Sequence, residues 1–286
     1  MTTLTTNKPS KVLVIGCGAG VTAGAVSIDP RVEHVLIVEI ELLVPRVVAE
    51  NFGEYNFDIV KNPKTEVIID DGRHYLLTTR ERFDAITSDP LDPWVKGTAT
   101  LYTKEFFELA KSKLKPGGVL TVWMPLYENT PAAVKSGIAS FFEVFPDGTI
   151  WGNTKEGEGC DTVLLGTLEP PHFNVDDVEK RLDQPEYAAV KKSLEDIGKY
   201  SAVELFATYA GRASELKQYL SDAEINRDRN LRLQYLAGLG MNLYQYGTIY
   251  AEILKYQRFP DDLFSGSEET ITHLRSAVEN APGRKP

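Results

Sequence analysis

The first half of the chain alternates between short apolar segments and segments with a helical pattern. The apolar segments are continuous runs, which is typical of strands that are buried on both faces. Helices of this length between successive strands imply right-handed crossovers and therefore a parallel sheet. Two further apolar segments follow each other closely and are expected to form an antiparallel pair at the edge of the sheet. The predicted strands are residues 11–16, 34–40, 65–70, 83–89 and 117–124, and the predicted edge pair is 141–152 with 160–167.

The pattern changes after Pro170-Pro171, and from about Asn174 the chain is mostly helical, with no strand alternation. We therefore predict two parts. Residues 1–169 form a Rossmann-like, doubly wound α/β domain, and residues 170–286 form a helical C-terminal extension.

Composition excludes several classes of partner. The net charge is −10 and there is no basic cluster, which argues against nucleic acid as a partner because phosphate neutralisation needs a Lys/Arg surface. No apolar run approaches the roughly 18 residues of a membrane span, and the first residues lack the apolar core of a signal peptide. The two cysteines, Cys17 and Cys160, suit a reducing, cytoplasmic setting.

A glycine-rich loop follows the first predicted strand, with glycines at the alternate positions Gly16, Gly18 and Gly20. Such a loop between a strand and a helix brings backbone amides close to a ligand, although any tight turn also favours glycine. The dinucleotide fingerprint has glycine or alanine where this chain has Val21, and no Walker lysine is present. The spacing therefore favours a nucleoside site of the S-adenosylmethionine type.

Acidic residues stand at the ends of successive predicted strands. Glu39 ends the second strand, where an acid can accept both ribose hydroxyls. Asp71, followed by Gly72, comes after the third strand, and Asp89 ends the fourth. Each acid alone could be a helix cap or a turn former. Because the carboxyl ends of parallel strands share one edge, the three together favour an adenosyl site.

The segment FDAITSDPLDPW, residues 83–94, has two carboxylates three residues apart, Asp89 and Asp92. With the loop and acids described above, it resembles the polyamine aminopropyltransferase (spermidine/spermine synthase) family, which has an aromatic-Asp pair, four mostly apolar residues and then Asp-x-x-Asp-Pro. The segments LYTKEFFELAKSKLKPGGVLTVW, WMPLY ending in Tyr127, and INRDRNLRL also resemble the spermidine synthase-like domains that are often fused to membrane segments.

This resemblance implies a class I S-adenosylmethionine-dependent methyltransferase fold, with a mainly parallel seven-stranded sheet and a reversed edge strand. It implies that Asp89 is the general base towards the attacking amine and that Asp92 binds the polyamine ammonium. It also implies that Glu39 binds the ribose and Asp71 the adenine amino group. The implied co-substrate is decarboxylated S-adenosylmethionine, and the implied partner is a small cationic amine.

Elementary chemistry agrees with these roles. An amine with a pKa near 10 is mostly protonated at neutral pH, so a carboxylate must both hold and deprotonate it. Trp94, Tyr102 and Tyr127 could wall the pocket, although aromatic residues after a strand are more often packing residues. The competing interpretation is that Asp89 and Asp92 only form a turn, because Asp-Pro pairs favour turns.

The chain departs from the family in two places. Ala19 stands where the synthases have a loop aspartate that binds the aminopropyl amine, so intact S-adenosylmethionine and methyl transfer are an alternative. Only about ten residues precede the first strand, where the family has an N-terminal β-domain. The pocket is therefore expected to be more open, closed by the extension, or completed by a partner such as a second copy in a homodimer.

Other function classes receive less support. A non-catalytic adenosyl-binding scaffold remains open, and Val21 disfavours a nicotinamide oxidoreductase. The four histidines have no metal-ligand spacing, so no metal is expected.

Overall fold

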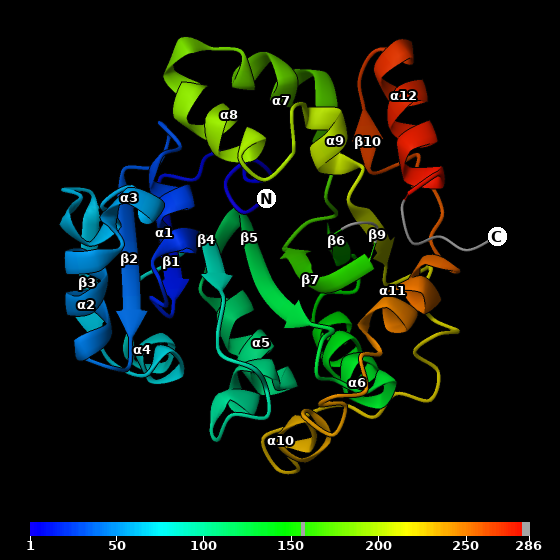
Figure 1. Cartoon of the computed structure of the whole chain (residues 1–286), viewed down its shortest axis with the longest axis horizontal. Helices are drawn as coiled ribbons and strands as arrows, with labels where there is room; N and C mark the ends of the chain where they lie inside the picture. Colours follow the sequence, from blue (N-terminus) through cyan, green and yellow to red (C-terminus); the bar gives the residue numbers. More distant parts are fainter. Residues whose placement is uncertain (156–157, 282–286) are drawn as a thin grey trace.

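The computed structural model describes residues 1–155 and 158–281 (Figure 1). Within these residues, one eight-stranded sheet has the strand order β3-β2-β1-β4-β5-β7-β6-β9. Its strands are β1 (Lys11–Ile15), β2 (His34–Glu39), β3 (Thr65–Ile69), β4 (Phe83–Ser88), β5 (Leu114–Pro125), β6 (Thr149–Lys155), β7 (Glu158–Thr167) and β9 (Tyr209–Arg212). Two short strands, β8 (Phe173–Asn174) and β10 (Phe264–Ser265), form a separate parallel pair.

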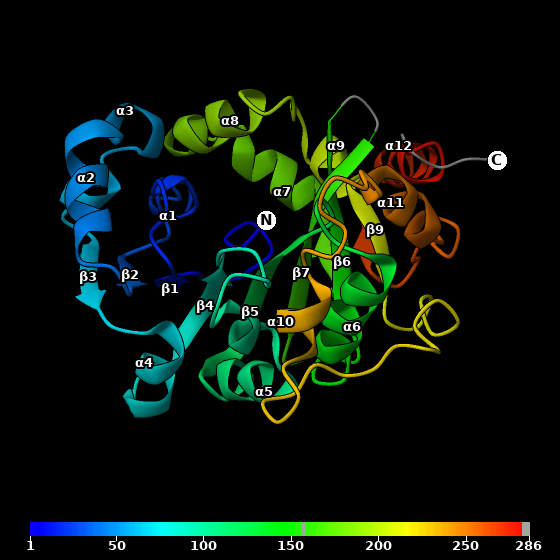
Figure 2. The same ribbon diagram turned by 60° about the horizontal axis from the view of Figure 1, so that its bottom comes forward.

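Helices cover both faces of the large sheet (Figure 2). The α-helices are α1 (Val21–Ser27), α2 (Leu43–Asn51), α3 (Gly53–Asn56), α4 (Gly72–Thr78), α5 (Lys104–Ser112), α6 (Pro131–Phe142), α7 (Val175–Leu182), α8 (Ala188–Glu195), α9 (Ala202–Phe206), α10 (Arg232–Leu236), α11 (Tyr246–Leu254) and α12 (Glu268–Glu279). The 3₁₀ helices are η1 (Ile59–Lys61), η2 (Thr98–Tyr102) and η3 (Pro185–Tyr187).

The first five strands are parallel, as the alternation of strands and helices predicts. β1 lies between β2 and β4, and β3 and β5 extend this parallel part on either side. Every residue of β1 except the first is buried, because helices cover both sides of the strand. The carboxyl ends of these strands meet at the lower edge of the sheet in Figure 1, and this edge bears the glycine loop and the acidic strand ends.

The second part of the sheet is antiparallel and differs in detail from the expectation. β6 and β7 do form the predicted antiparallel pair, but the reversed strand β7 lies inside the sheet, between β5 and β6. Residues 141–142 end α6, because Phe141 and Phe142 belong to the apolar face of that helix. The strand therefore begins only at Thr149.

The edge is formed by an eighth strand from the extension. β9 pairs antiparallel with β6, so the sheet has eight described strands where seven were predicted. This strand lies in the part of the chain that was expected to be mostly helical, where the helix α9 ends at Phe206. Tyr209 is fully buried against Trp151 of β6, with the ring centroids 5.7 Å apart, and this packing favours a strand. Residues 214–220 of the same part form turns instead of a helix.

The extension packs on both faces of the sheet, and its parts lie far apart in space. α7, α8, α9 and α12 cover the face that also bears α1, around a buried aromatic cluster that includes Trp151, Phe173 and Phe206. α10 and α11 cover the opposite face beside α6. The boundary between residues 169 and 170 stays a prediction.

One close contact shows how tightly the extension is joined to the sheet. A Cβ atom on Gly152 would lie 2.0 Å from the hydroxyl of Tyr250 in α11, and one on Gly159 would lie 2.2 Å from the same ring. Glycine is therefore required at both sheet positions for α11 to pack here.

Candidate active site

The glycine loop is shaped by short contacts with its surroundings. Gly20 has a φ of 81° at the start of α1, and a Cβ there would lie 2.7 Å from Nδ2 of Asn56. The same Asn56 amide donates a 2.9 Å hydrogen bond to the carbonyl of Ala19. Gly16 and Gly18 also have positive φ, at 88° and 50°. The alternating glycines thus give a left-handed backbone that other residues rarely adopt.

Glu39 lies directly behind this loop. Its side chain accepts hydrogen bonds from the backbone N–H groups of Cys17, at 2.7 Å, and Glu41, at 2.9 Å. Only 7% of the residue is exposed. The carboxylate therefore fixes the loop to the end of β2, a role that the sequence did not suggest. Its predicted contact with a ribose stays a prediction.

Asp71 and Gly72 follow β3 at the same edge. The Asp71 side chain caps α4 by accepting a 2.8 Å hydrogen bond from the backbone N–H of His74. This is the helix-cap role considered as the alternative, and the second carboxylate oxygen is chemically able to accept from a ligand. A Cβ on Gly72 would lie 2.5 Å from Cγ2 of Ile15, so glycine lets α4 approach β1 closely.

Asp89 is exposed at the end of β4 and lines a cavity of about 430 Å³. Its Oδ2 accepts a 2.7 Å hydrogen bond from the hydroxyl of Thr22 in α1. The cavity is also lined by Trp123 of β5, Asp161 of β7 and Lys199 of the extension. The extension therefore closes one side of the space beside Asp89, which was one of the three arrangements expected.

Asp92, Trp94 and Tyr102 share an unusual feature. Each has a buried polar atom, namely Asp92 Oδ1, Trp94 Nε1 and the Tyr102 hydroxyl, and within the described part of the chain none of these atoms has a hydrogen-bond partner. Buried polar groups are nearly always paired, because leaving one unpaired costs about 1–3 kcal/mol. Three such atoms in one short segment are what a binding site for a polar ligand would show.

The electrostatics of this segment favour a cation. Burial, followed by the nearby charge of Glu128, raises the pKa of Asp92. Burial and then the charges of Asp89 and Asp92 raise the pKa of Tyr102 well above its ordinary value. A cationic ligand would relieve both unfavourable effects.

Tyr127 and Asp161 complete the acidic surroundings. Burial, followed by the charges of Asp92 and Asp161, raises the pKa of Tyr127 to about 12. The Tyr127 ring lies against Trp123, with the centroids 5.9 Å apart. Burial raises the pKa of Asp161, whose carboxylate accepts hydrogen bonds from the side chains of Trp123 and Asn153, and Asp89 raises this pKa further.

Asp161 and Glu128 are the site residues that the sequence analysis missed. Asp161 lies near the start of β7 and pairs with Pro125 at the end of β5. Because β7 runs against β5, its beginning lies at the same edge as the carboxyl ends of the parallel strands. The predicted antiparallel pair could therefore have indicated that an acid at the start of its second strand, such as Asp161, lies at this edge.

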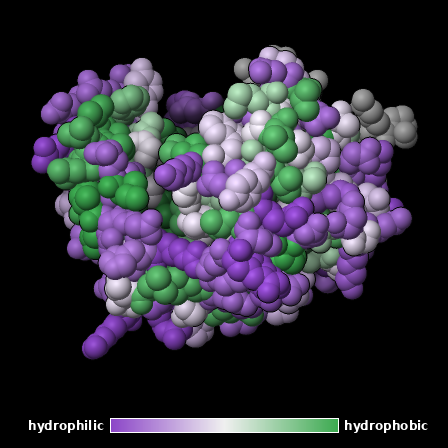
Figure 3. Space-filling view, turned by 90° about the horizontal axis from the view of Figure 1, so that it is seen from below, coloured by the Kyte–Doolittle hydropathy of each residue, from purple (hydrophilic) through white to green (hydrophobic). Residues whose placement is uncertain are grey.

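The surface at this edge of the sheet has a hydrophobic part and a hydrophilic part. Figure 3 views the molecule from below, and hydrophobic side chains gather on its left part, over α2 and α3, while hydrophilic ones dominate the centre. The exposed apolar residues after β2 include Ile40, Leu42 and Leu43. An apolar surface thus adjoins Glu39, whereas the acids lie further along the edge.

The glycine loop after β1 and a sheet with an internal reversed strand define the class of fold shared by spermidine synthases and class I methyltransferases. A family model described as the spermine/spermidine synthase domain matches residues 1–137. Over these residues the chain is therefore similar to the spermine/spermidine synthase domain, which confirms the resemblance noted from the motifs.

Curated relatives agree with this assignment. The polyamine aminopropyltransferase of Aeropyrum pernix is 32% identical over 171 residues, covering 55% of this chain and 54% of that protein. Polyamine aminopropyltransferase 2 of Hyperthermus butylicus is 29% identical over 176 residues, covering 60% of this chain and 58% of that protein. The chain thus spans little more than half of the length of these two relatives, 54% and 58%.

Solved structures agree on the fold. The spermidine synthase of Thermotoga maritima has a TM-score of 0.56 at 22% identity, covering 76% of this chain and 70% of that chain. A probable spermidine synthase of Corynebacterium glutamicum has a TM-score of 0.54 at 21% identity, covering 77% and 73%. In the described residues, no helix is both long and apolar enough to span a membrane.

Proposed function

We propose that this protein transfers an aminopropyl group from decarboxylated S-adenosylmethionine to a small amine. The observation that carries the proposal is the arrangement of the Asp-x-x-Asp-Pro segment at the end of β4. Asp89 faces a cavity beside the glycine loop, and Asp92 has a buried carboxylate oxygen without a partner. Two carboxylates so placed would attract an ammonium group and direct its nitrogen.

The donor would bind over the carboxyl ends of β1, β2 and β3. Residues proposed to contact it are the loop glycines 16, 18 and 20, Glu39 at the ribose and Asp71 at the adenine amino group, with Gly72 allowing close approach. The apolar side chain of Ile40, 70% exposed next to Glu39, suits the face of a purine. Open α/β sheets bind ligands at this edge of their strands.

The reaction needs little more than positioning and one base. The amine nitrogen attacks the propyl carbon next to the sulfonium, so a C–N bond forms while the C–S bond breaks. The electron pair of that bond stays on sulfur, which leaves neutral methylthioadenosine, and Asp89 takes the proton that the nitrogen loses. The sulfonium is already a good leaving group, so in-line orientation supplies most of the rate.

The acceptor would lie between Asp89, Asp92 and the cavity that Asp161 lines. Asp92 and Asp161 have pKa values raised by burial, and a bound ammonium would stabilise both as carboxylates. Trp94, Tyr102 and Tyr127 would contact the alkyl chain or the cation. A diamine has one nitrogen for attack and a second for such a carboxylate.

Methyl transfer from intact S-adenosylmethionine is the second candidate, and one observation favours it. Ala19 is exposed in the loop where the synthases have an acid, so it offers no carboxylate to the donor's aminopropyl amine. The curated relatives are polyamine aminopropyltransferases, and this favours aminopropyl transfer. That the chain acts as a homodimer stays a prediction, which light scattering would test.

Calorimetric titration with decarboxylated and intact S-adenosylmethionine, followed by an assay of both donors against a panel of amines, tests the proposal. We expect the decarboxylated donor to bind more tightly than the intact one and to yield methylthioadenosine with a diamine. Turnover of the intact donor alone would favour methyl transfer. Binding of an adenosyl ligand without turnover of either donor would favour the non-catalytic scaffold.

A further inference from the structure

The segment after Asp89, residues 90–102, is here called the acceptor loop. It bears three of the proposed acceptor contacts, Asp92, Trp94 and Tyr102, and ends in the short helix η2. Tyr102 is fully buried in the core, but the middle of the loop, around Lys96 and Gly97, is exposed. The position of Asp92 and Trp94 therefore depends on what holds the middle of this loop.

Gln234 of α10 binds the acceptor loop on both sides of its exposed turn. Its side-chain amide donates a 2.9 Å hydrogen bond to the carbonyl of Trp94 and accepts a 3.1 Å hydrogen bond from the backbone N–H of Gly97. A Cβ on Gly238, just after α10, would lie 3.0 Å from the Trp94 indole. α10 and the turn after it thus lie against both the backbone and the side chain of Trp94, the residue that follows the Asp-Pro pair.

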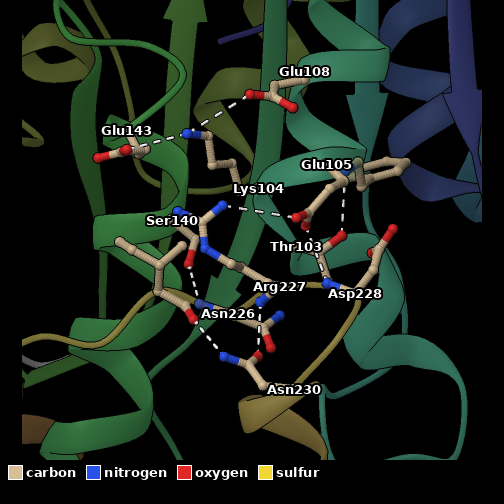
Figure 4. Close-up of polar contacts among 12 residues, drawn as sticks. Thr103, Lys104, Glu105, Glu108, Ser140, Glu143, Asn226, Arg227, Asp228 and Asn230 are labelled. Carbon is tan, nitrogen blue, oxygen red and sulfur yellow. Dashed lines mark hydrogen bonds and ion pairs between the residues drawn. The ribbon is translucent and has the colours of Figure 1, made fainter.

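Asn226 links the same loop to three other elements, and Figure 4 shows its contact with Ser140. Its side chain is completely buried, donates to the carbonyl of Ala99 at 3.1 Å, and accepts from the backbone N–H of Leu233 at 3.3 Å. Its backbone N–H donates to the hydroxyl of Ser140 in α6, and its carbonyl accepts from the backbone N–H of Lys104 in α5. One residue of the extension therefore ties η2, α5, α6 and α10 together.

Asp228 makes a third connection to the loop. It forms a bidentate ion pair with Arg73 of α4. The Arg73 guanidinium also donates a 3.2 Å hydrogen bond to the carbonyl of Thr100 in the acceptor loop. The backbone N–H of Asp228 donates to Glu105 at 3.1 Å, as Figure 4 shows. Asn226 and Asp228 of the segment INRDRNLRL, residues 225–233, are thus both linked to the acceptor loop, Asn226 directly and Asp228 through Arg73.

We propose that residues 226–238 of the extension are the positioning element of the acceptor site, with Gln234 as its main contact. The inference rests on the proposed function, because it assigns the acceptor loop to amine binding. The donor-side residues Glu39 and Asp71 have their hydrogen-bond partners within the α/β domain. Loss of the Gln234 contacts should therefore weaken the use of the amine and leave adenosyl binding as it is.

The test replaces Gln234 with leucine, which keeps most of the side-chain volume and removes both hydrogen bonds. The matched control is Gln218→Leu, at an exposed glutamine of the same extension. We expect Gln234→Leu to raise the KM for the amine about tenfold, as two hydrogen bonds of ordinary net strength would do. The dissociation constant of the adenosyl ligand should stay within twofold, and Gln218→Leu should change neither quantity.

A second readout follows the loop directly. Lys96 is exposed, so trypsin can cut the Lys96–Gly97 bond whenever the loop leaves its place. We expect this cut, identified by fragment mass, to be several times faster in Gln234→Leu and unchanged in Gln218→Leu. A general loss of folding would instead accelerate cuts throughout the chain and weaken adenosyl binding as well.

The outcomes separate the two proposals. An unchanged amine KM in Gln234→Leu, whatever the cleavage rate, would overturn the positioning role while leaving the transferase proposal in place. If the wild-type protein turns over no amine, the proposed function fails, and the trypsin comparison alone decides whether Gln234 holds the loop. Equal cleavage rates would then overturn the positioning role too.

Discussion

The hydroxyl of Thr22 donates a 2.7 Å hydrogen bond to Oδ2 of Asp89, and this bond joins the first helix to the end of the fourth strand. Thr22 follows the glycine loop proposed to hold the donor, and Asp89 begins the segment proposed to hold the acceptor. The bond fixes one carboxylate oxygen and so orients the other. A proposed general base is thus positioned by a residue next to the donor loop.

Replacing Asp89 with asparagine should lower kcat by about 10²–10⁴-fold, because an amide cannot take a proton from the amine. The asparagine carbonyl can still accept from Thr22, so the melting temperature and adenosyl binding should hardly change. Steady-state kinetics with the best amine, together with a thermal melt, checks both expectations. Wild-type turnover in this variant would show that the two acids only form a turn.

Replacing Asp92 with asparagine should mainly raise the KM for the amine, because this carboxylate is proposed to attract the ammonium in the ground state. The expected change is about tenfold or more, with a smaller effect on kcat. The same kinetic series measures it. A change in kcat with an unchanged KM would contradict the assignment of Asp92 as the ammonium holder.

The difference in melting temperature between the Asp92→Asn variant and the wild type should increase from pH 4 to pH 7. Burial, followed by the charge of Glu128, raises the pKa of Asp92 in the folded state. The protonated carboxyl therefore contributes to the free energy of unfolding below the unfolded pKa of about 3.9, and this contribution is lost as pH rises through the raised pKa. At pH 7 the wild type therefore carries an unfavourable charge that the asparagine lacks. We expect the variant to melt about 1–3 °C higher at pH 7 and at nearly the wild-type temperature near pH 4. A variant that melts lower than the wild type at pH 7 would contradict this sign.

Replacing Asp161 with asparagine should raise the KM for a diamine by roughly ten- to a hundredfold, since a charge-assisted hydrogen bond contributes about 1.5–3 kcal/mol. A monoamine of similar length should be affected much less, because it has no second ammonium. Asp183→Asn, at an exposed acid paired with Lys191, is the control for a change of surface charge. Equal effects on the diamine and the monoamine would remove Asp161 from the proposed acceptor site.

Replacing Glu39 with alanine should weaken binding of the adenosyl ligand by about 1.5–3 kcal/mol, because the ribose hydroxyls would lose a charged acceptor. The loop amide of Cys17 would lose its partner as well, so a modest drop in melting temperature is expected. Calorimetry measures the binding, and Glu66→Ala, at an exposed acid of β3, is the control. Binding that does not change would place the ribose elsewhere.

Much of the donor side can be predicted from the sequence. Runs of buried apolar residues define the parallel strands, and acids or glycines at their ends define what lies at the carboxyl edge. Gly20, Glu39 and Asp71 are proposed as donor contacts in this way because strand ends are local features of the chain. That parallel strands bring these ends to one edge follows from the connections alone.

The other residues of the proposed acceptor side, beyond the Asp-x-x-Asp-Pro segment and its aromatic neighbours, depended on the tertiary structure. Asp161 reaches the site because β7 inserts between β5 and β6, and the edge strand β9 exists because Tyr209 packs on Trp151. Gln234 binds Trp94 across 140 positions of the sequence. Hydrophobic periodicity states which face of a segment is buried but not which distant segment covers it. The sequence alone therefore determined the parallel part of the sheet, the glycine loop and the acids at the ends of these strands, whereas only the packing of the extension decided what holds the acceptor loop in place.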